Sequence, residues 1–275
     1  MRRFGRYDID DPGKIQGRDE VRAGDRSVAA IRLRAALDAL GSIGGSVLLL
    51  GCGAGRYVRA LKRYRPDLDV VGGDLSEIAL QEALGLDRDG HYVALDASRL
   101  PFSDGSFDGV VFFDLLEHVP EYRRMLAEIH RVLEPGGALH FYVPLEDQPG
   151  SIYTLLKDSD RLPLRIWKRD HVGHINFFTS ADVLHATWTA GLEVTGASFG
   201  FHPFGQLHDL VDYWQRERMA GGAGVLPLGA VNRIARVIFL FTWRLSYFED
   251  RLYHGPRLAS GIHVTATRPP AAPGF

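Results

Sequence analysis

An apolar run that ends in three closely spaced glycines occupies residues 47–55, VLLLGCGAG. The apolar part is typical of a buried parallel strand. Gly51, Gly53 and Gly55 allow a sharp turn and a close approach of the backbone to a ligand, because glycine has no Cβ. Residues 56–61 then read as the start of a helix. Strand, glycine turn and helix N-terminus together predict a nucleotide-type binding edge of an α/β fold.

The spacing of the glycines separates two classes of nucleotide site. The dinucleotide pattern G-x-G-x-x-G would need its third glycine at position 56, where the chain has Arg56. The pattern here is G-x-G-x-G, which argues against an NAD-dependent oxidoreductase. Glycine-rich turns are common, so this loop alone also fits a simple strand-to-helix turn.

Three further short apolar segments lead into an acidic residue. They are residues 69–74 ending at Asp74, residues 91–95 before Asp96, and residues 109–113 before Asp114. Asp74 lies about twenty residues beyond the glycine loop, where an acid can accept hydrogen bonds from ribose hydroxyls. A helix predicted over residues 121–133 precedes a fifth strand over residues 138–143. The alternation of strands and helices predicts a parallel sheet.

The order of these segments resembles a class I S-adenosylmethionine-dependent methyltransferase, in the subgroup of small-molecule enzymes that includes the ubiquinone/menaquinone C-methyltransferases. The matching pieces are residues 47–55, 71–76, 96–108, 114–119 and 131–137. The resemblance implies a Rossmann-like α/β fold with a seven-stranded, mostly parallel sheet and a helical insertion before the last strand. It also implies methyl transfer from S-adenosyl-L-methionine to a small-molecule or lipid-like acceptor.

The resemblance further implies a set of cofactor-binding residues. They are Gly51, Cys52, Gly53, Gly55, Asp74, Leu75, Asp96, Ala97, Phe113 and Asp114. The glycine loop would pass under the methionine part of the cofactor, Asp74 would bind the ribose, and Leu75 would lie beside the adenine. The family usually has an acid two residues before the first glycine, and here Leu49 stands there. Asp114 or an N-terminal acid is expected to compensate.

The remaining implied contacts lie at the next two strand ends. The Asp96 carboxylate would accept a hydrogen bond from the adenine amino group, and the Ala97 amide would meet a ring nitrogen. Phe113 and Asp114 would lie near the methionine moiety. Cys52 is the single cysteine of the chain, and packing against the ligand is a simpler role for it than nucleophilic catalysis.

Two histidines are candidates for catalysis. His174 precedes a segment, residues 176–179, that resembles a turn bordering the acceptor pocket of related methyltransferases, and an imidazole titrates near neutral pH. His118 follows the fourth predicted strand, and for both a structural role is the alternative. His171 and His174 are three residues apart, but no cysteine lies nearby and Asp170 is the adjacent carboxylate. We therefore expect no metal site.

The chain divides into five regions. They are an N-terminal flap and helix (1–40), a cofactor-binding core (41–147), an insertion with the end of the core (148–199), a helical lid (200–260), and a last strand with a tail (261–275). Residues 28–40 predict an amphipathic helix. Phe4, Tyr7 and Ile9 favour a flap over the cofactor rather than a disordered tail.

The region 200–260 separates two alternating segments, residues 192–199 and 261–267, which predict the antiparallel sixth and seventh strands. Its aromatic residues suit the wall of an acceptor pocket or a dimer interface. Residues 231–252 predict a helix with an apolar face and arginines opposite it. Its apolar stretch is shorter than the roughly 20 residues that span a bilayer. A lid or homodimer helix is expected, with a membrane-surface helix as the alternative.

Composition limits the remaining choices. The 275 residues carry a formal net charge of −2, which disfavours a nucleic-acid substrate. A single cysteine rules out an intramolecular disulfide, and no apolar stretch follows the basic first residues, so a cytoplasmic enzyme is expected. The main rival to a methyltransferase is a non-catalytic cofactor-binding or regulatory protein, which Leu49 makes conceivable.

Overall fold

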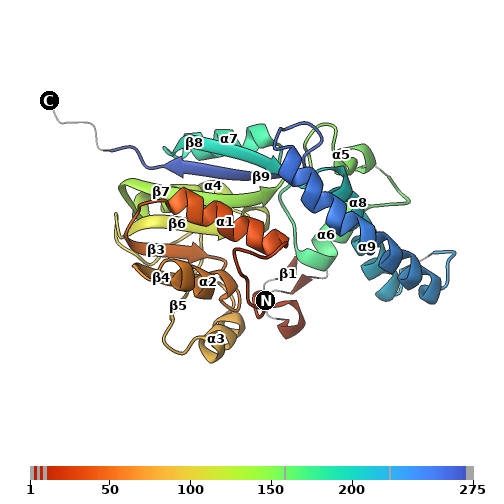
Figure 1. Ribbon diagram of the computed structural model, residues 1–275, viewed down its shortest axis with the longest axis horizontal. Coiled ribbons are helices and arrows are strands. Elements are labelled where there is room, and N and C mark those ends of the chain that lie inside the picture. Colours follow the sequence, from red (N-terminus) through yellow and green to blue (C-terminus); the bar gives the residue numbers. More distant parts are fainter. Residues whose placement is uncertain (1–2, 5–6, 9–10, 158, 223, 271–275) are drawn as a thin grey trace.

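The computed structural model describes residues 3–4, 7–8, 11–157, 159–222 and 224–270, and its centre is one twisted sheet (Figure 1). The strands are β3 (Gly45–Leu50), β4 (Leu68–Asp74), β5 (His91–Ala94), β6 (Phe107–Phe113), β7 (Leu133–Pro144), β8 (Glu193–Gly200) and β9 (Gly261–Thr267). Their order across the sheet is β5-β4-β3-β6-β7-β9-β8. A separate hairpin pairs β1 (Arg3–Phe4) with β2 (Tyr7–Asp8).

The sheet is parallel from β5 to β7, and β9 runs in the opposite direction to the other strands. Strand β9 pairs antiparallel with both β7 and β8. Strand β8 therefore runs in the same direction as β7, and the expectation of an antiparallel strand is right for β9 alone. Strand β7 also begins earlier than expected, because Leu133 pairs with Phe107 of β6.

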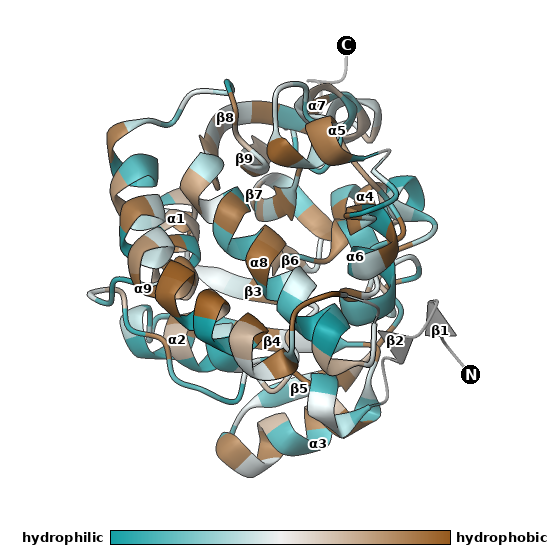
Figure 2. Ribbon diagram, turned by 90° about the vertical axis from the view of Figure 1, so that its right-hand side faces the viewer, coloured by the Kyte–Doolittle hydropathy of each residue, from teal (hydrophilic) through white to brown (hydrophobic). Residues whose placement is uncertain are grey.

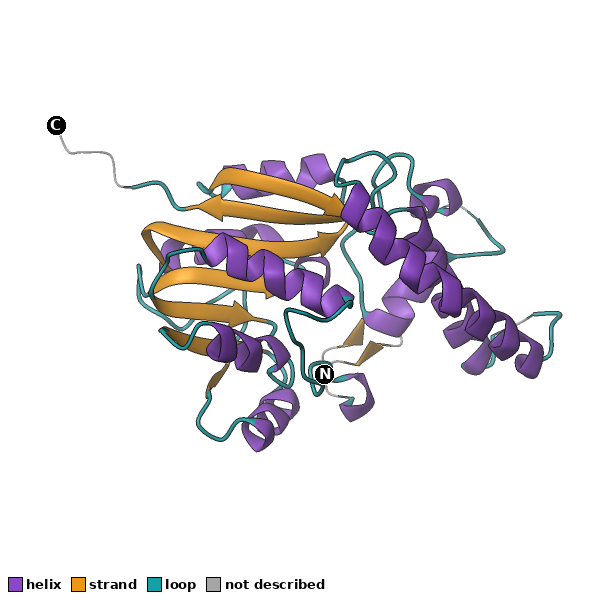
Figure 3. Cartoon of the chain, viewed as in Figure 1, coloured by secondary structure: helices purple, strands orange, loops and turns teal. Residues whose placement is uncertain are grey.

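Helices cover both faces of this sheet (Figure 3). Those that follow or flank the parallel strands are α1 (Val28–Leu40), α2 (Arg56–Tyr64), α3 (Glu77–Leu86), α4 (Tyr122–Val132) and α7 (Ser180–Thr189). Helices α1 and α2 pack on one face and α4 and α7 on the other. The predicted Rossmann-like α/β fold with a seven-stranded, mostly parallel sheet is confirmed.

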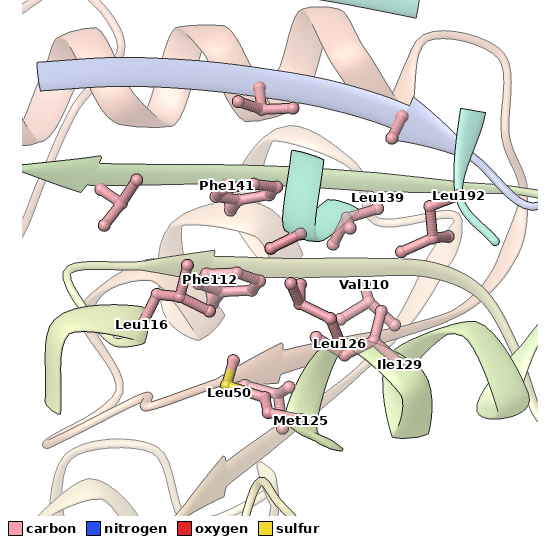
Figure 4. Close-up of a cluster of buried hydrophobic side chains, with 14 of the residues drawn as sticks. Leu50, Val110, Phe112, Leu116, Met125, Leu126, Ile129, Leu139, Phe141 and Leu192 are labelled. Atoms are coloured by element: carbon pink, nitrogen blue, oxygen red, sulfur yellow. The ribbon is translucent and has the colours of Figure 1, made fainter. Parts of the chain in front are cut away.

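The sequence of β3 explains why both faces are buried. Leu48 and Leu50 belong to the cluster on the α4 side, whereas Val47 and Leu49 belong to the cluster on the α1 side. Successive side chains of a strand point to opposite faces, so a continuous apolar run serves two helix layers. On the α4 side Phe112 stacks on a phenylalanine of the neighbouring strand β7 at 4.7 Å between ring centroids (Figure 4).

The remaining helices lie beyond the carboxyl end of the sheet. They are two 3₁₀ turns, η1 (Pro12–Lys14) and η2 (Leu116–His118), and the helices α5 (Ile152–Leu156), α6 (Leu164–Val172), α8 (Pro203–Met219) and α9 (Leu228–Leu252). The predicted elaboration between β8 and β9 is thus helical, with α8 and α9 packed together. The side chains of Phe4, Tyr7 and Ile9 lie outside the described residues, so their expected burial is untested.

Candidate functional site

The four acid and glycine positions singled out in the sequence lie at one edge of the sheet. Each follows or ends a parallel strand: the glycine loop after β3, Asp74 at the end of β4, Asp96 beyond β5, and Asp114 beyond β6. Strand β3 pairs with both β4 and β6, so the chain order reverses at this point. Ligands of open α/β sheets bind in the crevice at such a switch point.

Backbone amides and one carboxylate hold the glycine loop. Cys52 N donates to Gly73 O at 3.1 Å, and Gly53 N donates to Asp74 Oδ2 at 2.7 Å. The other Asp74 oxygen accepts from Ser76 N at 2.9 Å. Burial raises the pKa of Asp74, while these amide donors oppose the shift. Asp74 therefore ties β4 to the loop of β3 and stands at the centre of the edge.

An N-terminal segment covers the glycine loop. Gln16 O accepts from Ala54 N at 2.8 Å, and a Cβ built on Gly53 would lie 2.5 Å from that carbonyl oxygen. A Cβ on Gly55 would lie 2.5 Å from the Tyr92 hydroxyl. The backbone contact requires glycine at position 53, and the positive φ of 82° favours it at position 55. The sequence had suggested another reason, the approach of a ligand.

The expected adenine end is more open. Asp96 is exposed, and its Oδ1 accepts from Ser98 N at 2.8 Å and from Ser98 Oγ at 2.7 Å. Leu75 and Ala97 are both half-buried at the same edge. The Asp96–Ser98 hydrogen bonds stabilise the turn after β5. Leu75 and Ala97 are partly accessible where the resemblance implies adenine contacts.

Leu49 and Asp114 lie in contrasting surroundings, one apolar and one charged. Leu49 is 1% exposed within the α1-side core, so it offers the loop no polar group. Asp114 adopts a positive φ of 47° and accepts from Arg32 Nη2 of α1 at 2.8 Å. The Arg32 guanidinium lies 4.3 Å from the centroid of the Tyr142 ring. Arg32 was not among the predicted site residues, since nothing in a helical repeat shows which arginine meets a strand end.

Phe113 ends β6 and contacts the glycine-loop helix. It is 8% exposed, and its ring centroid lies 4.6 Å from that of Tyr57 on α2. Phe113 therefore packs between the end of β6 and helix α2, next to Asp114.

A buried polar cluster adjoins Asp114 on the side of α6. Glu117 is fully buried, and both of its carboxylate oxygens lack a hydrogen-bond partner within the described residues. His118 and His174, the two candidate catalytic residues, meet there with ring centroids 4.9 Å apart. Burial is the main cause that lowers the pKa of His118 to about 3. Burial strongly raises the pKa of Glu117, and the Asp114 charge adds to that shift.

A second buried carboxylate orients His174. Glu146 Oε1 accepts from His174 Nδ1 at 2.6 Å and from Lys168 Nζ at 3.2 Å. Burial would raise the pKa of Glu146, but the charges of Lys168 and His174 prevail and lower it to about 2. Glu146 and Lys168 belong to no sequence motif, because the segment after β7 and helix α6 meet only in the folded chain.

The pair His171 and His174 does not form one site. His171 Nε2 lies 2.9 Å from Glu217 Oε2 of α8, away from Glu117. The backbone oxygen of His171 accepts from Lys14 Nζ at 3.2 Å. The three-residue spacing thus places the two rings in separate networks.

A cavity of about 480 Å³ opens beside Arg32. Residues from α1, β7, β8 and α9 line it, among them Ile31, Arg32, Tyr142, Phe199, Phe201 and Tyr247. Aromatic and aliphatic side chains make up about half of the lining, and the other half is charged or polar, including Arg34, Asp250 and Arg251. Small-molecule sites of this size commonly combine apolar walls with polar groups. Through Arg32, the cavity borders the Asp114 end of the strand edge.

Helix α9 exposes most of its large apolar side chains and buries smaller ones. The residues that it buries are Val231, Ala235, Thr242 and Ser246. Large apolar residues instead point outward: Val237 is 51% exposed, Phe241 65%, Phe248 63% and Leu252 79%. Figure 2, which views the molecule from this side, shows hydrophobic residues along α8 and α9. Among the described residues no helix is both long and apolar enough to cross a membrane.

Comparisons with known proteins agree with this architecture. The [4+2]-cyclase SpnF is structurally similar, with a TM-score of 0.57 and 20% identity over 98% of this chain and 88% of that chain. Phosphoethanolamine N-methyltransferase 2 of Haemonchus contortus, in complex with S-adenosyl-L-methionine, has a TM-score of 0.57 and 20% identity over 87% of this chain and 52% of that one. These likenesses establish the fold, which is that of class I methyltransferases.

The sequence comparison goes further for the core of the chain. Residues 48–141 match the family described as "Methyltransferase domain", the segment in which the sequence motifs lie. The ubiquinone/menaquinone biosynthesis C-methyltransferase of Desulfotalea psychrophila is 33% identical over 146 residues, covering 48% of this chain and 51% of that protein. The chain thus spans about half the length of this curated relative.

Proposed function

We propose that this protein transfers a methyl group from S-adenosyl-L-methionine to a small-molecule or lipid-like acceptor. The observation that carries the proposal is the strand edge of the methyltransferase domain, where the glycine loop, Asp74, Asp96 and Asp114 meet. The residues fit the cofactor in their chemistry. Helix α2 begins at Gly55 without a side-chain cap, so its first amides can donate to a carboxylate, and Asp74 can accept from ribose hydroxyls.

The roles of individual residues follow from this placement. When bound, the cofactor supplies an activated methyl group on its sulfonium, so the protein mainly has to align donor and acceptor and exclude water. The loop and Asp74 would hold the ribose and methionine parts, with Leu75, Asp96 and Ala97 at the adenine. Asp114 would face the methionine part, held by Arg32. The segment at Gln16, packed on the loop, would act as the flap.

The cavity beside Arg32 supports a binding site for the methyl acceptor. Its aromatic side chains suit the apolar part of an acceptor, and one relative is named as a C-methyltransferase of ubiquinone and menaquinone biosynthesis. Tyr247 brings α9 to its wall, so part of the region 200–260 would act as the lid. His118 and His174 would lie on the acceptor side of Asp114. A cytoplasmic setting remains part of the proposal.

Calorimetry with S-adenosyl-L-methionine and S-adenosylhomocysteine tests the cofactor site. We expect micromolar-range binding, on the order of −8 kcal/mol. Asp74→Ala should weaken it, whereas Asp69→Ala at the opposite end of the same strand is the matched control and should not. Equal affinities of the two variants would contradict the assigned edge.

Turnover tests the transfer itself. Release of S-adenosylhomocysteine is measured by mass spectrometry with a panel of quinols, phenols and acyl lipids. Methylated product from one of these classes is the expected result. Tight cofactor binding without product from any acceptor would favour the rival, a non-catalytic binding protein, and the likeness to a cyclase shows that this fold supports other chemistry.

The outer face of α9 supports a membrane surface as the place where a lipid-like acceptor is met. Phe241, Phe248 and Leu252 are exposed on this face. Arg233 and Arg244 are exposed on the same helix. An apolar stripe beside cationic residues is typical of helices that lie in the interface of anionic bilayers. An anionic membrane surface accounts for the arginines, whereas a purely apolar dimer contact would not require them.

Vesicle sedimentation distinguishes a membrane surface from a second copy of the chain as the binding partner of this face. Binding to vesicles with phosphatidylglycerol should exceed binding to phosphatidylcholine alone, and Phe241→Ser with Phe248→Ser should abolish it. Trp188→Ser, which removes a 68% exposed aromatic residue from α7, is the control and should bind normally. A stable dimer that the serine pair dissociates, with no vesicle binding, would show that a second copy covers this face instead.

A further inference from the structure

We propose that Glu117, His118 and His174 form a binding site for a divalent first-row transition-metal ion such as Zn²⁺ or Mn²⁺. One ligand atom from each of these residues lies within 4.8 Å of the other two. The inference concerns ion binding by the chain itself and does not depend on methyl transfer. It departs from the expectation of no metal site, which considered His171 as the partner of His174.

The distances suit three ligands around one ion. His118 Nε2 and His174 Nε2 each lie 3.8 Å from Glu117 Oε1. In a tetrahedral site with metal–ligand bonds of about 2.1 Å, ligand atoms are about 3.4 Å apart. The two contacts to Glu117 therefore need to close by a few tenths of an ångström, which side-chain torsions can supply, and the third pair of ligand atoms lies within 4.8 Å.

The hydrogen bonds of both imidazoles present the required nitrogen. His118 Nδ1 lies 3.1 Å from Gly173 O, and a carbonyl oxygen can only accept, so Nδ1 carries the proton. His174 Nδ1 likewise donates to the Glu146 carboxylate at 2.6 Å. In both rings Nε2 is then the nitrogen that faces Glu117. Metal-ligating histidines commonly have this arrangement, with the other ring nitrogen donating to a carboxylate or a carbonyl.

Glu117 provides an independent sign of a missing ligand. Its side chain is 0% exposed, and neither oxygen accepts a hydrogen bond among the described residues. A buried carboxylate without donors is costly unless it binds a cation or becomes neutral. Arg32 is paired with Asp114, and Lys168 with Glu146 and Asp209, so neither cation forms an ion pair with Glu117.

Two imidazoles and one carboxylate favour a transition ion over Mg²⁺ or Ca²⁺, which prefer oxygen ligands. The ion would join two chain segments that already meet through the backbone. Ile175 N and Asn176 N both donate to Glu117 O, at 2.9 and 3.1 Å. Three protein ligands leave a further coordination position of Zn²⁺ for water or an acceptor oxygen.

The experiment uses the full-length protein freed of metal by a chelator and then dialysed. Calorimetric titration with Zn²⁺, Mn²⁺ and Mg²⁺ should show one ion per chain for Zn²⁺ or Mn²⁺ and weaker binding of Mg²⁺. Loss of a second-shell partner commonly costs ~10–100-fold in affinity. His118→Ala and Glu117→Gln should therefore weaken binding by at least that much.

His171→Ala is the matched control, since His171 lies in a different network, and its affinity should equal that of the wild type. Thermal unfolding guards against misfolding: Glu117→Gln should melt like the metal-free wild type but lose the rise in Tm that the ion produces. No stoichiometric binding by the wild type would overturn the proposal. So would unchanged binding by Glu117→Gln, which would mean that Glu117 is simply protonated in its buried position.

Discussion

Replacing Gly53 with alanine tests how the N-terminal segment is attached to the glycine loop. The added Cβ would lie 2.5 Å from Gln16 O, a backbone atom that cannot rotate away. The same carbonyl accepts from Ala54 N at 2.8 Å. We therefore expect the substitution to push residues 15–17 off the loop.

The expected cost has three parts. A non-glycine residue at the positive φ of Gly53 costs about 1–2 kcal/mol. Loss of the Ala54–Gln16 hydrogen bond costs about 0.5–1.5 kcal/mol. Ile15, only 7% exposed against Ala54 and Ala79, would lose part of its burial. Together these predict a decrease in the free energy of unfolding of about 2–4 kcal/mol.

Gly136→Ala is the matched control. Gly136 also has a positive φ, of 88°, but a Cβ there would meet nothing within 4 Å. Urea unfolding should show a smaller loss for Gly136→Ala than for Gly53→Ala, and trypsin should cleave after Arg18 faster in the Gly53 variant alone. Equal losses in both variants, with unchanged cleavage, would refute the contact between Gln16 and the loop as the cause.

Three further changes probe Asp74, the pair of Arg32 with Asp114, and the pair of His202 with Asp250. Asp74→Ala should weaken S-adenosyl-L-methionine binding by roughly 1.5–3 kcal/mol, measured by calorimetry, because hydrogen bonds to a charged group are lost. Arg32→Met should lower stability by leaving the partly buried Asp114 carboxylate without its cation, and urea unfolding should show that adding Asp114→Asn restores part of the loss; no restoration would argue against the pair. His202 has a raised pKa through its hydrogen bond to Asp250, despite burial. Its contribution is therefore complete below the unfolded pKa near ~6.5 and is lost as pH rises through the higher folded value. Between pH 6 and 9 the wild type should lose more stability than Asp250→Asn, and parallel curves would contradict this assignment.

The fold was accessible from sequence because its signals are local. An apolar run such as residues 47–50 can only be buried on both faces, and the glycines after it can only form a turn, so strand and loop were predictable residue by residue. The same holds for Asp74, Asp96 and Asp114, whose places at strand ends follow from the strand pattern. The helical character of residues 231–252 was also readable from its period.

The orientation of that helix was not readable. An amphipathic pattern shows that one face is apolar but does not show which surface meets it, and here small residues such as Ala235 face α8 while Phe241 faces outward. The direction of β8 likewise depends on its pairing with β9, a contact between strands that α8 and α9 separate in the chain.

The sequence by itself determined the local elements, the parallel core and the set of polar residues at its edge. Tertiary structure alone decided which distant groups meet: Arg32 with Asp114, Gln16 with the glycine loop, and His174 with Glu117 rather than with His171. The physical reason is that strand and turn preferences act between near neighbours. Pairings of charged and polar side chains depend on helices and loops that pack from remote parts of the chain.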